Sequence, residues 1–147
     1  MKNTFILFGL FIAMSCSPKT APNENQGITG QVTWSAGNQM PGPDRKESGQ
    51  KGIQREVLFY ELTHKSQAEG QGPIYNKINS KLIRKMMTDS NGIFNVELPE
   101  GGYSVFVKEK DGYYANSFDT HNIITPVDVV KGEMKKITIN INYLASY

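Results

Sequence analysis

Apolar and polar residues alternate with a period of two through most of the chain from residue 28 onward. Ile28 and Val32, for example, alternate with Thr29, Gln31 and Thr33. Similar alternation recurs in later runs at residues 94–98, 103–108 and 137–143. Each run has one apolar face, which is typical of a half-buried β-strand. Because such a face must be buried against a second sheet, the pattern predicts an all-β fold with two packed sheets.

Short segments rich in Gly, Asn, Asp and Pro separate these runs. They lie at residues 89–92, 99–102, 110–112 and 131–132. Gly and Asn tolerate positive φ and Pro presets the φ of a turn, so we expect these segments to close β-hairpins. Many short strands joined by such turns predict an antiparallel β-sandwich. Trp34 continues the apolar face of Ile28 and Val32 and is expected to lie in the core.

Two segments do not follow the alternation. Residues 36–54 are rich in Gly, Pro and charge and are predicted to form an inserted loop. A loop of this length is usually either functional or disordered, and its composition favours disorder. In residues 65–81, Gly72 and Pro73 either start a short helix or lead into a strand over residues 82–88. Both alternatives stay open.

The run at residues 57–62 is apolar on both faces, unlike its neighbours. Its second face therefore needs a cover. Our preferred interpretation is that residues 65–81 fold back over Leu58 and Tyr60. The alternative is that Leu58, Tyr60 and Phe106 form an exposed patch that binds a partner.

The N-terminus has the pattern of a signal peptide. Lys2 precedes ten residues without charge, at positions 5–14, in the order of an n-region and an h-region. At about 1.5 Å per residue, such a run reaches only about half of a bilayer core, so a permanent spanning helix is not expected. Residues 13–16, Ala-Met-Ser-Cys, resemble a bacterial lipobox. The resemblance implies that residues 1–15 are removed and that the Cys16 thiol carries a diacylglycerol anchor.

The predicted organisation is a signal peptide at residues 1–15, the lipidated Cys16 with a flexible tether at 16–27, and a sandwich domain at 28–147. Ser17 after the cysteine, in place of Asp, implies transport to the outer membrane, and the lack of an acidic run favours the periplasm-facing leaflet. The chain has 16 Lys and Arg against 14 Asp and Glu, so we expect no nucleic-acid partner. Its single cysteine excludes an internal disulfide and a Cys-rich zinc site.

The turn and strand motifs together form a recognisable pattern. It consists of Gly30 with Val32, Thr-Asp-Ser-Asn-Gly-Ile-Phe-Asn-Val at 88–96, Leu-Pro-Glu-Gly-Gly-Tyr-Ser-Val at 98–105, and Gly112 with Tyr113. This pattern resembles the carboxypeptidase regulatory-like family over residues 27–142. The resemblance implies an antiparallel, transthyretin-like (Ig-like) β-sandwich of about seven strands, common in bacterial envelope lipoproteins. Residues 44–52 have no place in the family pattern.

The residues do not predict catalysis. A zinc carboxypeptidase needs two His and a Glu as ligands, whereas this chain has only His64 and His121 and no His-x-x-Glu. The segment at 89–92 begins like a Ca²⁺ loop, but no further oxygen ligands follow. The C-terminal Tyr-Arg-Gly-Ser of the transthyretin-like ureide hydrolases is replaced by Leu-Ala-Ser-Tyr at 144–147. We therefore expect no catalytic residues, no metal and no cofactor.

One segment, residues 113–122, combines aromatic and polar side chains. Its candidate ligand-binding residues are Tyr113, Tyr114, Asn116, Asp119 and His121. Aromatic rings beside such groups can stack on a sugar and hydrogen-bond its hydroxyls; alternatively, these residues pack into the end of the sandwich. The predicted function is a lipid-anchored, non-enzymatic envelope module that binds or assembles through its sandwich edge or loops. The alternative is a small carbohydrate-binding lipoprotein that serves glycan uptake.

Overall fold

The computed structural model describes residues 26–38, 40 and 50–146. The predicted signal peptide, Cys16, most of the tether and residues 41–49 of the inserted loop lie outside this range. The described chain is built of strands, with one short 3₁₀ helix, η1, at Lys65–Gln67. The prediction of an all-β sandwich is confirmed.

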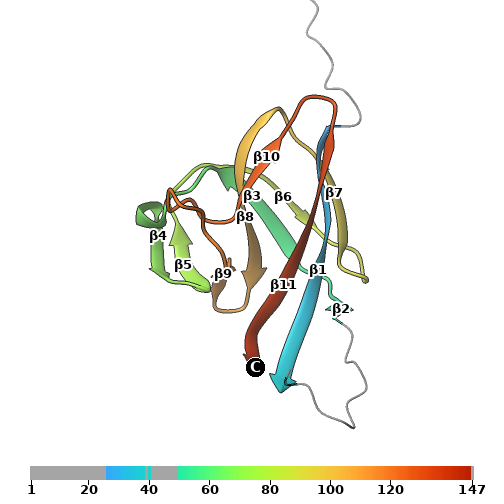
Figure 1. Ribbon diagram of the computed structural model, residues 1–147, viewed down its shortest axis with the longest axis vertical. Coiled ribbons are helices and arrows are strands. Elements are labelled where there is room, and N and C mark those ends of the chain that lie inside the picture. Colours follow the sequence, from blue (N-terminus) through green and yellow to red (C-terminus); the bar gives the residue numbers. More distant parts are fainter. Residues whose placement is uncertain (1–25, 39, 41–49, 147) are drawn as a thin grey trace, which may run out of the picture.

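Two sheets make up the sandwich (Figure 1). The first sheet contains β1 (Gly27–Asn38), β2 (Lys51–Gly52), β7 (Ile93–Glu97) and β11 (Met134–Ser146). The second sheet contains β3 (Glu56–Glu61), β4 (Ala68–Gln71), β5 (Ile74–Ile78), β6 (Leu82–Met87), β8 (Gly101–Glu109), β9 (Gly112–Tyr114) and β10 (Pro126–Val129). The described residues thus hold eleven strands, against the expected about seven, because several short strands flank the long ones.

One strand pair departs from the antiparallel expectation. β11 runs parallel to β1 along its whole length, from Gly27 opposite Met134 to Asn38 opposite Ser146, and Figure 1 shows the two as long neighbours. The other strand pairs of the described residues are antiparallel. β11 starts beside the start of β1, and the chain enters it from β10, which belongs to the other sheet.

The turn segments reverse the chain, but most of them do not close hairpins. Of the four turn segments named from the sequence, only the one at residues 110–112 joins two strands that pair with each other, β8 and β9. The segments at 89–92, 99–102 and 131–132 instead carry the chain from one sheet to the other. The hairpin prediction was wrong at these three places, because turn residues determine a reversal and not the strand that accepts the hydrogen bonds.

The core between the sheets, which we call the inner cluster, follows the alternation of the sequence. It contains Ile28 and Val32 of β1, Val57 and Phe59 of β3, and Phe94 of β7, each at most 2% exposed. Trp34, which was expected in the core, is only partly buried against this cluster, and its ring lies edge-to-face with that of Tyr143, with the centroids 5.6 Å apart.

A second cluster, the outer cluster, covers the opposite face of β3. Leu58 and Tyr60 pack there with Tyr75 of β5, Phe106 of β8 and Ile124. The rings of Tyr75 and Phe106 lie 6.2 Å apart although β9 separates their strands, so the second sheet curves over this face. The interpretation that residues 65–81 cover Leu58 and Tyr60 is confirmed, and the exposed partner patch was wrong.

Strands form in both segments that do not follow the alternation, residues 65–81 and 36–54. Residues 74–78 form β5 and residues 82–87 form β6, so the strand alternative holds and the helix alternative does not. The inserted loop is shorter than 36–54, because β1 continues to Asn38 and β2 pairs back onto it, with Lys51 opposite Trp34.

Candidate binding site

A cavity of about 630 Å³ lies at the end of the second sheet, between the β4–β5 turn and residues 115–118. We call it the β4–β5 cavity. Its walls also include Lys65 of η1 and Asn142 of β11. Its size falls within the range of about 300–1,000 Å³ that is usual for ligand pockets.

The cavity exists because the chain leaves the sheet directly after β9. β5 pairs with β9 through Ile74 and Tyr75, opposite Tyr114 and Tyr113. The next amide, that of Ala115, donates to the carbonyl of Pro73 at 2.9 Å. Residues 116–118 then run beside the β4–β5 turn without pairing to it, which leaves space between the two segments.

The lining combines one exposed ring with uncharged polar groups. Phe118 is 55% exposed, and the Lys65 Nζ lies 3.6 Å from its ring centroid. The side-chain amides of Gln71 and Asn116 make no hydrogen bond within the described residues. Lys65 is the only charged side chain among the described residues that line the cavity. This lining suits a neutral or negatively charged ligand.

Asp119 fixes the turn that follows Phe118. Its Oδ1 accepts hydrogen bonds from the amides of Ile123 and His121, both at 2.9 Å. The Ile123 amide bond is the main cause that lowers the pKa of Asp119, and the His121 amide adds to it. The Asp119 amide in turn donates to the Ile123 carbonyl at 3.0 Å, and Phe118 bridges to Ile124. Asp119 therefore holds the backbone on which Phe118 is presented.

The structure separates the predicted site residues. Asn116 lines the β4–β5 cavity, whereas Asp119 serves the turn and the largely exposed His121 lies 3.8 Å from it. Tyr113 is half-buried beneath the Lys108 Nζ, which lies 4.1 Å from its ring centroid. The ring of Tyr114 is fully buried, so the stacking role expected of it does not hold.

Tyr114 instead reaches from one sheet to the other. Its hydroxyl donates to the Asn140 carbonyl of β11 at 2.7 Å and accepts from the Asn142 amide at 3.4 Å. One hydroxyl thus satisfies two backbone groups of β11, as a neighbouring strand would. We interpret Tyr114 as a residue that protects the middle of this strand.

Of the predicted site residues only Asn116 lines the cavity, and the lining residues that the sequence did not predict include Phe118, Gln71 and Lys65. Phe118 lies inside the predicted aromatic and polar segment, and its position in a loop was the available signal. Gln71 of β4 and Lys65 of η1 gave no signal, because both come from residues 65–81, a segment without periodicity.

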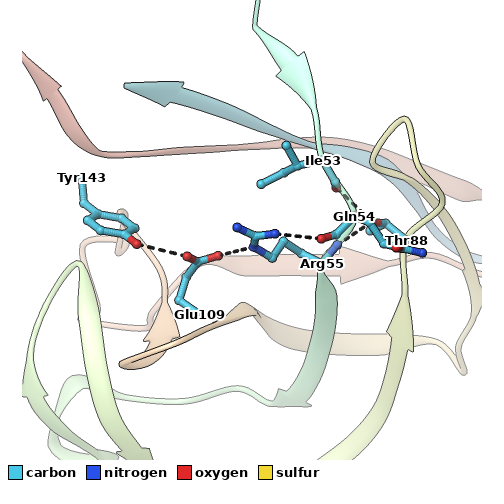
Figure 2. A network of polar contacts seen from close by, with 6 residues as sticks. All are labelled: Ile53, Gln54, Arg55, Thr88, Glu109 and Tyr143. Carbon is cyan, nitrogen blue, oxygen red and sulfur yellow. Dashed lines mark hydrogen bonds and ion pairs between the residues drawn. The ribbon is translucent and has the colours of Figure 1, made fainter. Parts of the chain in front are cut away.

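An ion pair between Arg55, which directly precedes β3, and Glu109 of β8 lies at one end of the sandwich, and Tyr143 of β11 links it to the other sheet (Figure 2). The Arg55 Nε donates to Glu109 Oε1 at 2.7 Å, and the Tyr143 hydroxyl donates to Glu109 Oε2 at 3.1 Å. Burial raises the pKa of Tyr143, and its hydrogen bond to Glu109 adds to the shift. Both oxygens of the Glu109 carboxylate accept hydrogen bonds, so we interpret this network as structural, holding β8 to β11.

Two other features, a metal site and a membrane-spanning helix, are absent from the described residues. Within residues 26–38, 40 and 50–146, no three His, Cys, Asp or Glu side chains are grouped to hold a metal ion. The same residues contain no helix with the length and apolarity to cross a bilayer. Comparisons with protein families, with curated proteins and with solved structures found no match.

Proposed function

We propose that this protein is a lipid-anchored, non-enzymatic binding module of a bacterial cell envelope, and that its ligand binds in the β4–β5 cavity. The observation that carries the proposal is the lining of this cavity. Phe118 stays largely exposed there, and the exposed amides of Gln71 and Asn116 make no hydrogen bond to another residue that the structure describes. Convergent polar groups around an exposed aromatic ring are typical of ligand sites.

The anchor rests on the sequence of the N-terminus. Cys16 follows a short apolar run and a lipobox-like tripeptide. Acyl chains at about 0.8 kcal/mol per buried CH₂ anchor a protein durably once two or more are attached. Ser17 after the cysteine supports a place in an outer membrane, and the lack of an acidic run after Cys16 favours its periplasm-facing leaflet.

Photo-crosslinking in cells tests binding at the cavity. A photo-reactive residue in place of Asn116 should give a defined adduct, and the same residue in place of the exposed Asn95 of β7 should not. Adding Phe118→Ala should remove the adduct. Equal labelling from both positions, or labelling that survives Phe118→Ala, would contradict binding in the cavity.

Membrane fractionation tests the anchor separately. Cys16→Ala should release the protein into the soluble fraction, while wild type stays with the membranes. Full retention of Cys16→Ala in the membrane fraction would rule the lipid anchor out and would leave the cavity proposal untouched.

A second candidate is assembly through the sandwich edge, at the place where β10 and β11 lie beside a cavity. β10 pairs only with β8 and β11 only with β1 among the described strands, and a smaller cavity of about 290 Å³ lies between β10 and β11. An extended segment of a partner can add to such edges. A photo-reactive residue in place of Thr138 would detect this partner.

A further inference from the structure

We propose that the β4–β5 cavity binds a short saccharide through Phe118 and the amides of Asn116 and Gln71. This inference rests on the proposed function and names the class of ligand. It differs from the site expected from the sequence, because the aromatic platform is Phe118 in place of Tyr113 and Tyr114.

The first argument is the pairing of one ring with several amides. A sugar ring presents C–H groups on its faces and hydroxyls around its rim. The exposed ring of Phe118 suits the apolar face, because aromatic rings bind through their flat surfaces. Side-chain amides supply both donors and acceptors, so Asn116 and Gln71 suit hydroxyls, which also do both.

The second argument is that the polar groups of the site are available without rearrangement. The exposed amides of Asn116 and Gln71 make no hydrogen bond to another described residue, so a ligand has to displace water there and no protein group. The Ser117 hydroxyl lies on the same wall. The walls themselves are held by the Ala115–Pro73 hydrogen bond and by the Asp119 turn. A site held in this way loses little conformational entropy when it binds.

The third argument is charge. Lys65 is the only charged residue that lines the cavity among those the structure describes. Its ammonium group covers one side of Phe118, and an exposed cation–π contact of this kind is weak, about 0.5–1 kcal/mol. A saccharide can therefore take the place of Lys65 on the ring, and an acidic saccharide gains an ion pair with it.

Calorimetric titration of the full chain in detergent tests the proposal. The probes are chitotriose and maltotriose as neutral saccharides, trigalacturonic acid as an acidic one, and trialanine as a peptide of similar length. Saturable binding of at least one saccharide, and none of trialanine, is expected. Phe118→Ala should weaken that binding about tenfold, and Asn116→Ala about two- to tenfold.

Matched variants identify the site. Met87→Ala of β6 removes a side chain as exposed as Phe118, 57% against 55%, and should leave the affinity unchanged. Lys65→Ala should leave neutral saccharides within about twofold and should weaken trigalacturonic acid, because it removes only the charge beside the ring. Thermal unfolding of each variant shows that it is folded.

The outcomes separate this inference from the proposed function. Saccharide binding that Phe118→Ala does not weaken would overturn the inference. Binding of trialanine alone, lost in Phe118→Ala, would overturn the saccharide and keep the binding module. If no probe binds but the photo-reactive residue at position 116 still gives its adduct in cells, the saccharide is overturned and the binding module is kept. No adduct from position 116 in a chain that keeps Phe118 would refute the module itself.

Discussion

Removing the Arg55 guanidinium tests whether its ion pair with the buried Glu109 carboxylate stabilises the sandwich. Arg55→Met keeps most of the aliphatic stem and leaves the Glu109 carboxylate, whose side chain is only 5% exposed, without its cation. Breaking a fully buried pair costs about 3–5 kcal/mol. Because the Arg55 side chain is 37% exposed, water can partly replace it, and we expect a loss of about 2–3 kcal/mol in the free energy of unfolding.

Lys85→Met is the matched control. Lys85 pairs with Glu56 at 3.2 Å, but the two side chains are 60% and 30% exposed. Exposed pairs of this kind are worth about 0–1 kcal/mol, so this variant should lose less than about 1 kcal/mol. The comparison removes the same kind of charge from two environments.

Urea unfolding followed by the fluorescence of Trp34, the single tryptophan, measures both variants. In a Glu109→Gln background, Arg55→Met should cost less than about 1 kcal/mol, because the buried charge is already gone. Equal losses for Arg55→Met and Lys85→Met, or an unchanged loss in the Glu109→Gln background, would refute the reasoning.

Three further predictions concern the backbone and the tyrosines. Gly92→Ala should lower the free energy of unfolding by more than about 3 kcal/mol, because its Cβ would lie 2.1 Å from a carbonyl oxygen of β1. Gly37 has nearly the same φ, +77° against +76° for Gly92, but open space around it, so Gly37→Ala should cost only about 1 kcal/mol in urea unfolding. Tyr114→Phe should cost about 1–2 kcal/mol and increase self-association in sedimentation, because it exposes backbone groups of β11. Burial is the main cause that raises the pKa of Tyr60 to about 12, and Tyr113 adds to it. Between about pH 10 and 12 the Tyr60 hydroxyl therefore ionises only in the unfolded state, so the free energy of unfolding should fall over this range, and Tyr60→Phe should reduce the fall.

The all-β fold was predictable because alternation is a local property. The run at residues 94–98 became a strand with Phe94 and Val96 buried and Asn95 and Glu97 exposed, as the sequence indicates. The parallel pairing of β1 with β11 was not predictable in this way. Residues 27–38 and 134–146 are far apart in sequence, and neither run carries a signal for its partner.

The site was predictable only in part, for the same reason. Asn116 and the segment around Phe118 stand out by composition. Tyr114 has the same composition signal, yet its ring is buried and its hydroxyl bonds the backbone of β11. Sequence alone does not separate a buried tyrosine with a satisfied hydroxyl from an exposed one, because both are amphipathic. Gln71 reaches the cavity through β4, a strand without an alternating pattern.

Backbone amide chemical shifts of the full chain, recorded during titration with an extract of its native cell envelope, test the central claim most directly. The account predicts saturable changes at residues 70–72 and 115–118, which line the β4–β5 cavity, and their loss in Phe118→Ala. Changes confined to β10 and β11 that persist in Phe118→Ala would contradict binding in the cavity and would favour assembly through the sandwich edge.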